Sequence, residues 1–200
     1  MIKTTTPEPE RAHLRFVEEV LAAFDFLATE YEFHLAKVEI TFVRYESRDV
    51  FVNVYHGRAS FELNCEIGYL TADSNHPERP FYLGEILDLM GGLHETGYTF
   101  FQASSAERVK QFVPKVADLI KHYAKSALEG DPTTFKRLAD LRWAKSRARE
   151  KQETLIRTRE KASEAWSKKD YLKVIELFDP VRDDLTPAEI KKLEYAKKHL

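Results

Sequence analysis

The spacing of apolar residues changes twice along this chain of 200 residues. Between Glu10 and Thr29 they recur every three or four positions, with Leu14, Val17 and Leu21 on one stripe. A stripe of this kind is typical of an amphipathic helix that buries one face. We therefore predict one continuous N-terminal helix.

The spacing then shortens to two. Apolar and polar residues alternate over 38–42, 50–55 and 60–67, and a weaker strand is expected near 33–36. Polar breaks of three or four residues separate the stronger strands, and breaks this short permit only hairpins. The pattern predicts an antiparallel β-meander, with Cys65 among its inward residues.

Helical spacing returns before residue 131. A capping box of Ser104 and Glu107 opens a helix that runs to about Glu129, and Pro114 inside it predicts a kink or a later start. Three elements precede it, namely a loop at 71–80, a short helix at 82–90 and a strand at 98–102. Together these elements predict an α+β body at 1–131, with helices covering the apolar face of the sheet.

The tripeptide Gly130-Asp131-Pro132 ends one helix and begins another, because it supplies a C-cap, an N-cap and a first-turn proline. The new helix is predicted over 132–168. Its stretch 144–154 is polar on all sides, which is typical of a helix exposed to solvent. Residues 169–200 are predicted to form a small helical tail, with a second capping box at 186–189.

Composition and charge narrow the class of protein. No apolar run reaches the roughly 20 residues of a membrane-spanning helix, and the polar first ten residues lack a signal peptide's apolar stretch. A single cysteine excludes an intramolecular disulfide. Together these features lead us to expect a cytoplasmic protein without membrane contact.

Residues 1–135 carry 13 Lys and Arg against 21 Asp and Glu, a net charge of −8. Residues 136–169 carry 12 against 5, a net charge of +7, which indicates units with different surroundings.

The polar side of the predicted sheet is the first candidate site. Glu62 and Glu66 could act as acid and base or hold a divalent cation, although a half-buried sheet needs a solvated face in any case. The turn at 56–58 could bind an anion through its His and Arg, or be polar only because it is exposed. The candidate binding residues are Arg44, Glu46, Asn53, Tyr55, His56, Arg58, Glu62, Asn64 and Glu66.

The basic helix is the second candidate site, because its cations could follow a phosphate backbone. The basic positions of the helix are scattered around it, and it could equally lie over an acidic surface of the body or of a partner. Its candidate residues are Arg142, Lys145, Arg147, Arg149 and Arg157. The sequence contains no paired-histidine motif, phosphate-binding loop or Gly-x-Ser-x-Gly, so we expect no metal, no cofactor and no catalytic residues.

Two stretches resemble known families. Arg44-Tyr45-Glu46-Ser47 and Val54-Tyr55-His56-Gly57-Arg58 are similar to a family of uncharacterised bacterial proteins, over about residues 10–140. That resemblance implies a bacterial cytoplasmic protein, and the size and architecture resemble immunity proteins that neutralise toxins, by analogy of fold and scale. The stretch 170–176, with Ala162 and Ala165 upstream and Pro180 downstream, resembles one tetratricopeptide-type helical hairpin. This second resemblance implies packing against another helix or chain.

These observations lead to one hypothesis of function and two alternatives. The leading hypothesis is a non-enzymatic bacterial cytoplasmic protein, of immunity or regulatory type, that binds a protein partner such as a toxin or a second copy of itself. The first alternative is a nucleic-acid-binding protein that uses the helix at 136–169. The second is a hydrolase-type enzyme with Glu62, Glu66, Arg44 and His56 in one pocket.

Overall fold

The computed structural model describes residues 8–70 and 79–200, so residues 71–78 of the predicted loop lie outside the described residues. The fold is α+β, as predicted, and the chain divides into two compact units, residues 1–141 and 142–200. Within the described ranges, no helix combines the length and the apolar character that crossing a membrane requires.

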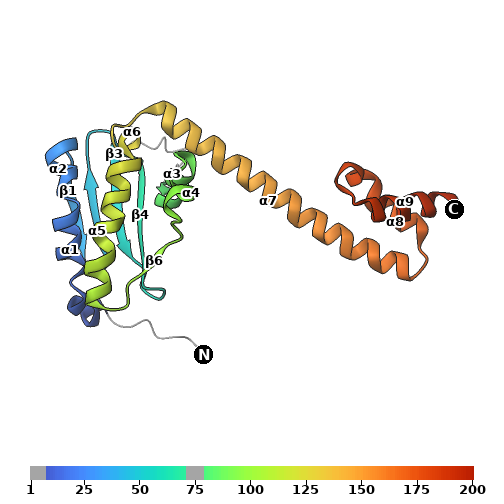
Figure 1. The fold of residues 1–200 in the computed structure, drawn as a ribbon, viewed down its shortest axis with the longest axis horizontal. Helices are drawn as coiled ribbons and strands as arrows, with labels where there is room; N and C mark the ends of the chain where they lie inside the picture. The colour runs from blue at the N-terminus through green and yellow to red at the C-terminus, as the bar shows by residue number, and fades with distance from the viewer. Residues whose placement is uncertain (1–7, 71–78) are drawn as a thin grey trace. The chain divides into compact units, whose positions relative to one another are not determined.

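The first unit is built on a six-stranded antiparallel sheet (Figure 1). Four strands follow one another in space as in sequence, and two short strands pair with the fourth. The strands are β1 (His34–Glu39), β2 (Phe42–Glu46), β3 (Val50–His56), β4 (Glu62–Tyr69), β5 (Phe81–Tyr82) and β6 (Phe101–Gln102). The predicted meander is confirmed.

One face of this sheet forms the core of the first unit. Val52, Val54, Cys65 and Ile67 point into it and are buried, as the alternation predicts. Each fully buried side chain of this size stabilises the fold by about 1.5–3 kcal/mol. The helices that pack on this face include α1 (Phe16–Ala23), α3 (Leu83–Leu89) and α5 (Ala106–Tyr123) (Figure 1).

The prediction of one continuous N-terminal helix is wrong. Three short pieces replace it, namely η1 (Glu8–Leu14), α1 and α2 (Phe26–Tyr31). The chain breaks at Arg15, whose φ of 57° is left-handed. Leu14 and Phe16 are both buried, and so are Phe24 and Phe26. Residues two apart point to opposite sides of one helix, so only a broken helix brings all four into the core.

The predicted strand at 38–42 is also wrong, because this stretch contains a hairpin. Ile40 and Thr41 form the turn between β1 and β2. The weaker prediction near 33–36 overlaps β1. The apolar alternation continues through the turn, and the turn lacks the Gly, Pro, Asn or Asp residues that would have marked it.

The N-cap of helix α5 lies one residue later than predicted. Ser105, and not Ser104, is the N-cap, and its Oγ accepts the backbone N–H of Arg108 at 3.4 Å. The helix begins at Ala106 and continues past Pro114, so the later start is not observed. Two further short helices are α4 (Gly92–Thr96), which the sequence did not predict, and α6 (Lys125–Leu128).

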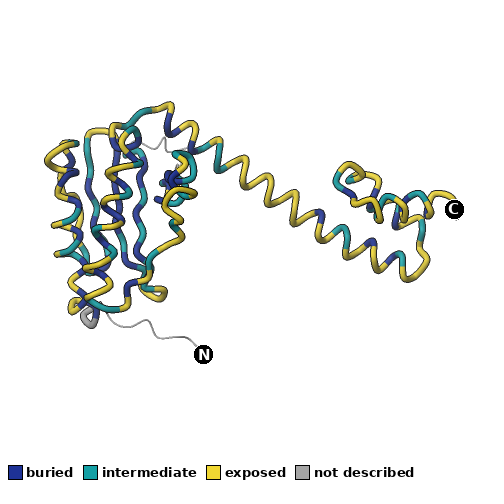
Figure 2. The backbone as a smooth tube through the Cα atoms, in the orientation of Figure 1, coloured by how far each residue is buried: buried dark blue, intermediate teal, exposed yellow. Residues whose placement is uncertain are grey.

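The long helix α7 (Pro132–Ser167) begins at the predicted junction. The carboxylate of Asp131 accepts the backbone N–H of Thr134 at 2.9 Å, which satisfies a donor that has no partner within the helix. The first turns of α7 belong to the first unit, where Phe135 is buried. Every residue from 143 to 154 is exposed (Figure 2), as the polar pattern predicts.

The second unit is entirely helical. After α7 it contains α8 (Tyr171–Phe178), η2 (Asp179–Asp184) and α9 (Pro187–Lys198). The predicted capping box is present, since Thr186 forms it with Glu189 at the start of α9. Asp170 caps α8. A small apolar cluster holds these helices together, and its buried members are Ala162, Ala165, Val174, Phe178, Leu185, Leu193 and Ala196.

Candidate functional site

Seven of the nine candidate residues on the sheet lie together, on the face that points away from the core. The strand register places Arg44, Asn53 and Glu66 in one line across β2, β3 and β4, with Tyr55 opposite Asn64 in the next line. We call this surface the polar sheet face and define it as Arg44, Glu46, Asn53, Tyr55, Glu62, Asn64 and Glu66.

Two asparagine amides fix the carboxylates of the polar sheet face. Nδ2 of Asn53, a residue only 6% exposed, donates to Oε1 of Glu66 at 2.8 Å. Nδ2 of Asn64 donates to Oε1 of Glu62 at 3.2 Å. In the part of the chain that the structure describes, no ion pair joins either carboxylate to a cation. Both charges are therefore held in place and open to an outside cation.

The cation on this face already has partners. Nε of Arg44 donates to Oε1 of Glu46 at 2.6 Å, and its guanidinium lies 4.1 Å from the centroid of the Phe51 ring. The ring lies over Gly68, where a Cβ atom would come within 2.6 Å of Cζ. This half-buried pair offsets its own charge, so the face keeps the negative charge of the two carboxylates on β4.

Tyr55 lies on β3, between β2 and β4, and its side chain is half-buried. Burial first, and then the nearby carboxylates Glu66 and Glu62, raise the pKa of its hydroxyl. The hydroxyl therefore stays protonated at neutral pH and can donate a hydrogen bond. A tyrosine of this kind offers a partner both a flat apolar ring and a polar tip.

His56 does not belong to this face, and its prediction as a binding residue there is wrong. It pairs with Leu63, points into the core and is 2% exposed. Its Nε2 lies 2.9 Å from the carbonyl oxygen of Ala103, and burial lowers the pKa of its imidazole. The reason is the pleat, since Tyr55 points outward and the next residue must point inward. Arg58 is exposed, but it lies in the turn beyond the strand.

The inward orientation of His56 also contradicts the hydrolase alternative, which requires four residues in one pocket. Glu62, Glu66 and Arg44 lie on the polar sheet face, whereas His56 lies on the core side of the sheet. A general base must come within hydrogen-bond reach of the group that it deprotonates. These four residues therefore do not form one pocket.

Arg11 is a buried cation that the sequence analysis missed. It lies in η1, is 4% exposed and donates from Nη1 to the carbonyl oxygen of Gly57 at 2.9 Å. It also donates to the carbonyl oxygen of Arg58, and it lies 4.4 Å over the Phe61 ring. Arg11 thus holds the turn at 56–58 through hydrogen bonds to its backbone carbonyl oxygens. No spacing in the sequence indicates this contact, because 46 residues separate Arg11 from Gly57.

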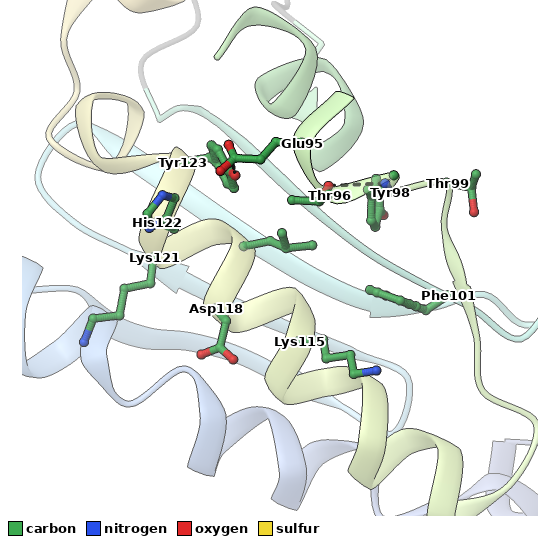
Figure 3. A pocket seen from close by; sticks show the side chains of 12 residues that line it. Glu95, Thr96, Tyr98, Thr99, Phe101, Lys115, Asp118, Lys121, His122 and Tyr123 are labelled. Atoms are coloured by element: carbon green, nitrogen blue, oxygen red, sulfur yellow. Dashed lines mark hydrogen bonds between the residues drawn. The ribbon is translucent and has the colours of Figure 1, made fainter. Parts of the chain in front are cut away.

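A second feature absent from the sequence analysis is an open hollow of about 1010 Å³ beside α5 (Figure 3). Tyr98 and Phe101 line it from one side, and Lys115 and Asp118 from α5 line it from the other. Burial raises the pKa of the Tyr98 hydroxyl to about 12. The predicted strand at 98–102 pairs only at its last two residues, so Tyr98 lies off the sheet.

The candidate residues of the basic helix lie in the second unit. At 100° per residue, all of them except Arg147 fall within an arc of about 120° of the helix surface. Part of the basic charge of α7 is matched inside the unit. Nε of Arg149 lies 2.9 Å from Glu153, and Nε of Arg159 lies 2.8 Å from Glu189.

In the described ranges 8–70 and 79–200, neither the cysteine nor a cluster of metal-ligating side chains forms a further site. Cys65 is fully buried, and burial raises the pKa of its thiol. Among the described residues, no group of three or more His, Cys, Asp and Glu could hold a metal ion.

Comparison with known proteins adds no relative. A scan against protein-family models, a search of curated proteins and a search of solved structures found no match to this chain. The resemblances to a bacterial family and to a tetratricopeptide hairpin therefore stay predictions.

Proposed function

We propose that this chain is a non-catalytic protein whose polar sheet face binds a positively charged surface on a partner protein. The observation that carries the proposal is the pair of carboxylates on β4. Glu62 and Glu66 are each fixed by an asparagine amide, and neither has a cation of its own in the described part of the chain. A toxin neutralised by an immunity-type protein, or a regulated enzyme, would be partners of this class.

The charge of the whole first segment supports this choice of partner. Residues 1–135 carry a net charge of −8, from 13 basic and 21 acidic residues. A field of one sign attracts an oppositely charged partner before contact and raises the association rate, with a strong dependence on salt. The fixed carboxylates would then give the contact its register.

The internal hydrogen bonds of the face support a binding role for a second reason. Asn53 and Asn64 hold the carboxylates without a partner, so docking orders few side chains. Association costs about 0.5–1.5 kcal/mol for each flexible side chain that it immobilises, and a preformed face avoids this cost. Tyr55 lies at the centre of the same face, and tyrosine is among the residues enriched at interface hot spots.

The test is affinity capture from an extract of the cells that produce the protein, with the full chain as bait. We expect one protein in stoichiometric amount, captured at low salt and lost as salt rises. The variant E62K/E66K should lose that protein, because it presents two cations to a cationic surface. The matched control is E18K/E107K, which makes the same change of net charge at exposed positions on α1 and α5.

The two double variants distinguish binding through the polar sheet face from a general effect of net charge. Loss of capture in E62K/E66K with retention in the control supports the polar sheet face. Equal capture by both variants, or no stoichiometric protein from any bait, would overturn the proposal.

A second candidate function rests on the arc of cations on α7. Arg142, Lys145, Arg149 and Arg157 share one side of a helix whose residues 143–154 are all exposed. Such an arc could bind the phosphates of a nucleic acid, with an affinity that falls as salt rises. A gel shift of a short DNA duplex by the full chain tests this alternative. No shift at low salt removes it, and a shift that R149E/R157E abolishes would favour it.

A further inference from the structure

Strand β1 is an edge of the sheet that stays open. Among the described strands it pairs only with β2, and its residues are exposed or, at Glu39, partly exposed. Two apolar side chains lie on it, with Leu35 45% exposed and Val38 44% exposed. An exposed edge strand offers unpaired backbone N–H and C=O groups to another strand.

A bulge in β1 decides which side chains share a face. Leu35 pairs with Tyr45 and Lys37 pairs with Arg44, so Ala36 is an extra residue between them. This insertion places Leu35 and Val38 on the same side of the sheet, the side of the core. His34, Lys37 and Glu39 pair with residues of the opposite side.

We propose that β1 pairs with β1 of a second copy of this chain, antiparallel and with Leu35 opposite Val38 of the second copy. In this register the two apolar side chains meet on the core side. The imidazole of His34 meets the carboxylate of Glu39 on the polar side, a donor facing an acceptor. Lys37 meets the small Ala36. Because the relation is symmetric, each contact occurs twice.

Neighbouring registers do not fit. A shift of one residue in one direction sets Lys37 opposite Lys37 of the second copy, and like charges directly opposite each other are destabilising. A shift in the other direction sets Lys37 opposite Leu35, although these two side chains point to opposite sides of the sheet. In the proposed register the ammonium of Lys37 also keeps its own partner, since Nζ lies 2.6 Å from Oε1 of Glu39.

The pairing has a consequence for the binding surface. Residues that pair across antiparallel strands point to the same side, so the two sheets would continue as one. Both polar sheet faces would then lie on the same side of the dimer. The edge pairing itself does not depend on the proposed partner of that face.

Sedimentation velocity of the full chain tests the pairing over a roughly hundredfold range of concentration, because interfaces this small are weak. We expect the mass to rise from 23.3 kDa toward twice that value. The variant L35K/V38K should stay at one chain, whereas L35K/V38E should dimerise again, because opposite charges now face each other. L172K, at an exposed residue of α8, is the surface control and should dimerise like the wild type.

A disulfide test reads the register directly. Paired antiparallel residues have Cα atoms about 4.5–5.5 Å apart, a distance that a disulfide spans. Oxidised L35C/V38C should therefore form a covalent dimer, while V38C alone should not, because its two copies would lie about 10 Å apart along the strands. A wild type that stays at one chain at all concentrations, dimerisation retained by L35K/V38K, or equal cross-linking by V38C would each refute the proposal.

Discussion

Nη1 of Arg11 lies 3.4 Å from Nδ1 of His56, inside the first unit. A guanidinium can only donate, so Nδ1 accepts and the ring proton lies on Nε2, which donates to the carbonyl oxygen of Ala103 at 2.9 Å. The imidazole is therefore held neutral by partners from η1 and from the segment before α5. This one side chain ties the candidate turn to two distant parts of the chain.

The first prediction concerns pH. Burial lowers the pKa of His56 below its ordinary value of 6.5 in the folded protein. The unfolded chain then binds a proton at a higher pH than the folded chain, so this contribution to the free energy of unfolding is fully present above about pH 6.5 and is lost as the pH falls. Urea unfolding at about pH 7.5 and about pH 5.5 measures the loss, which should be smaller in H56Q. Equal losses in wild type and H56Q would count against the neutral, buried imidazole.

The second prediction concerns Arg11. The change Arg11→Ala removes the donors for the carbonyl oxygens of Gly57 and Arg58, and leaves both without this partner. We expect the free energy of unfolding to fall by about 3 kcal/mol. Arg108→Ala, at an exposed position of α5, should change it by no more than about 0.5 kcal/mol. Similar urea midpoints for the two variants would show that the buried guanidinium contributes little.

The third prediction concerns Gly68. A Cβ atom at this position would lie 2.6 Å from Cζ of Phe51, so the ring must move and Arg44 loses its support. We expect Gly68→Ala to destabilise the protein by about 1–3 kcal/mol. Gly84→Ala is the matched control, because its Cβ meets nothing closer than 3.9 Å and the residue lies inside helix α3. Gly84→Ala should stabilise the protein by up to about 1 kcal/mol. Equal thermal midpoints for the two variants would contradict the close packing of Phe51 on Gly68.

The fourth prediction concerns the end of α7. Lys169 has a left-handed φ of 58°, and the next residue, Asp170, donates its N–H to the carbonyl oxygen of Ala165 at 2.9 Å. Glycine adopts this backbone without strain, so Lys169→Gly should stabilise the second unit by about 1 kcal/mol. Thermal unfolding followed by Trp166 fluorescence, with Trp143 replaced by Phe, measures it.

The neighbouring residue provides the control for that prediction. Lys168 has no left-handed φ, so Lys168→Gly gains nothing from the backbone and should destabilise by about 0.5–1 kcal/mol. If both glycine variants shift the midpoint in the same direction, the backbone at Lys169 is not under strain.

Local rules predicted the parts of this fold that local interactions decide. The caps at Asp131 and Thr186 needed only a short side chain and the next backbone N–H groups, and both are present. The alternation on β4 likewise placed Glu62 and Glu66 on the face away from the core. That part of the candidate site follows from the pleat alone.

The rest depends on contacts between distant residues. The break at Arg15 allows Leu14 and Phe16 to be buried together. A continuous helix would point these two residues to opposite sides, so helical spacing in the sequence does not reveal the break. Arg11 is buried because a turn some 46 residues later offers it carbonyl oxygens. The inward orientation of His56 could have been predicted from the sequence, because Val54 points inward and the pleat repeats every second residue.

The stretch 143–154 of α7 buries no side chain, so neither apolar core holds it in shape. Its order rests on backbone hydrogen bonds and on ion pairs such as Arg149 with Glu153. An isolated helix of this length is only marginally stable in water. Local unfolding of this stretch would therefore cost little free energy while both apolar cores remain intact. Its amide protons would exchange with solvent sooner than those of the buried strands.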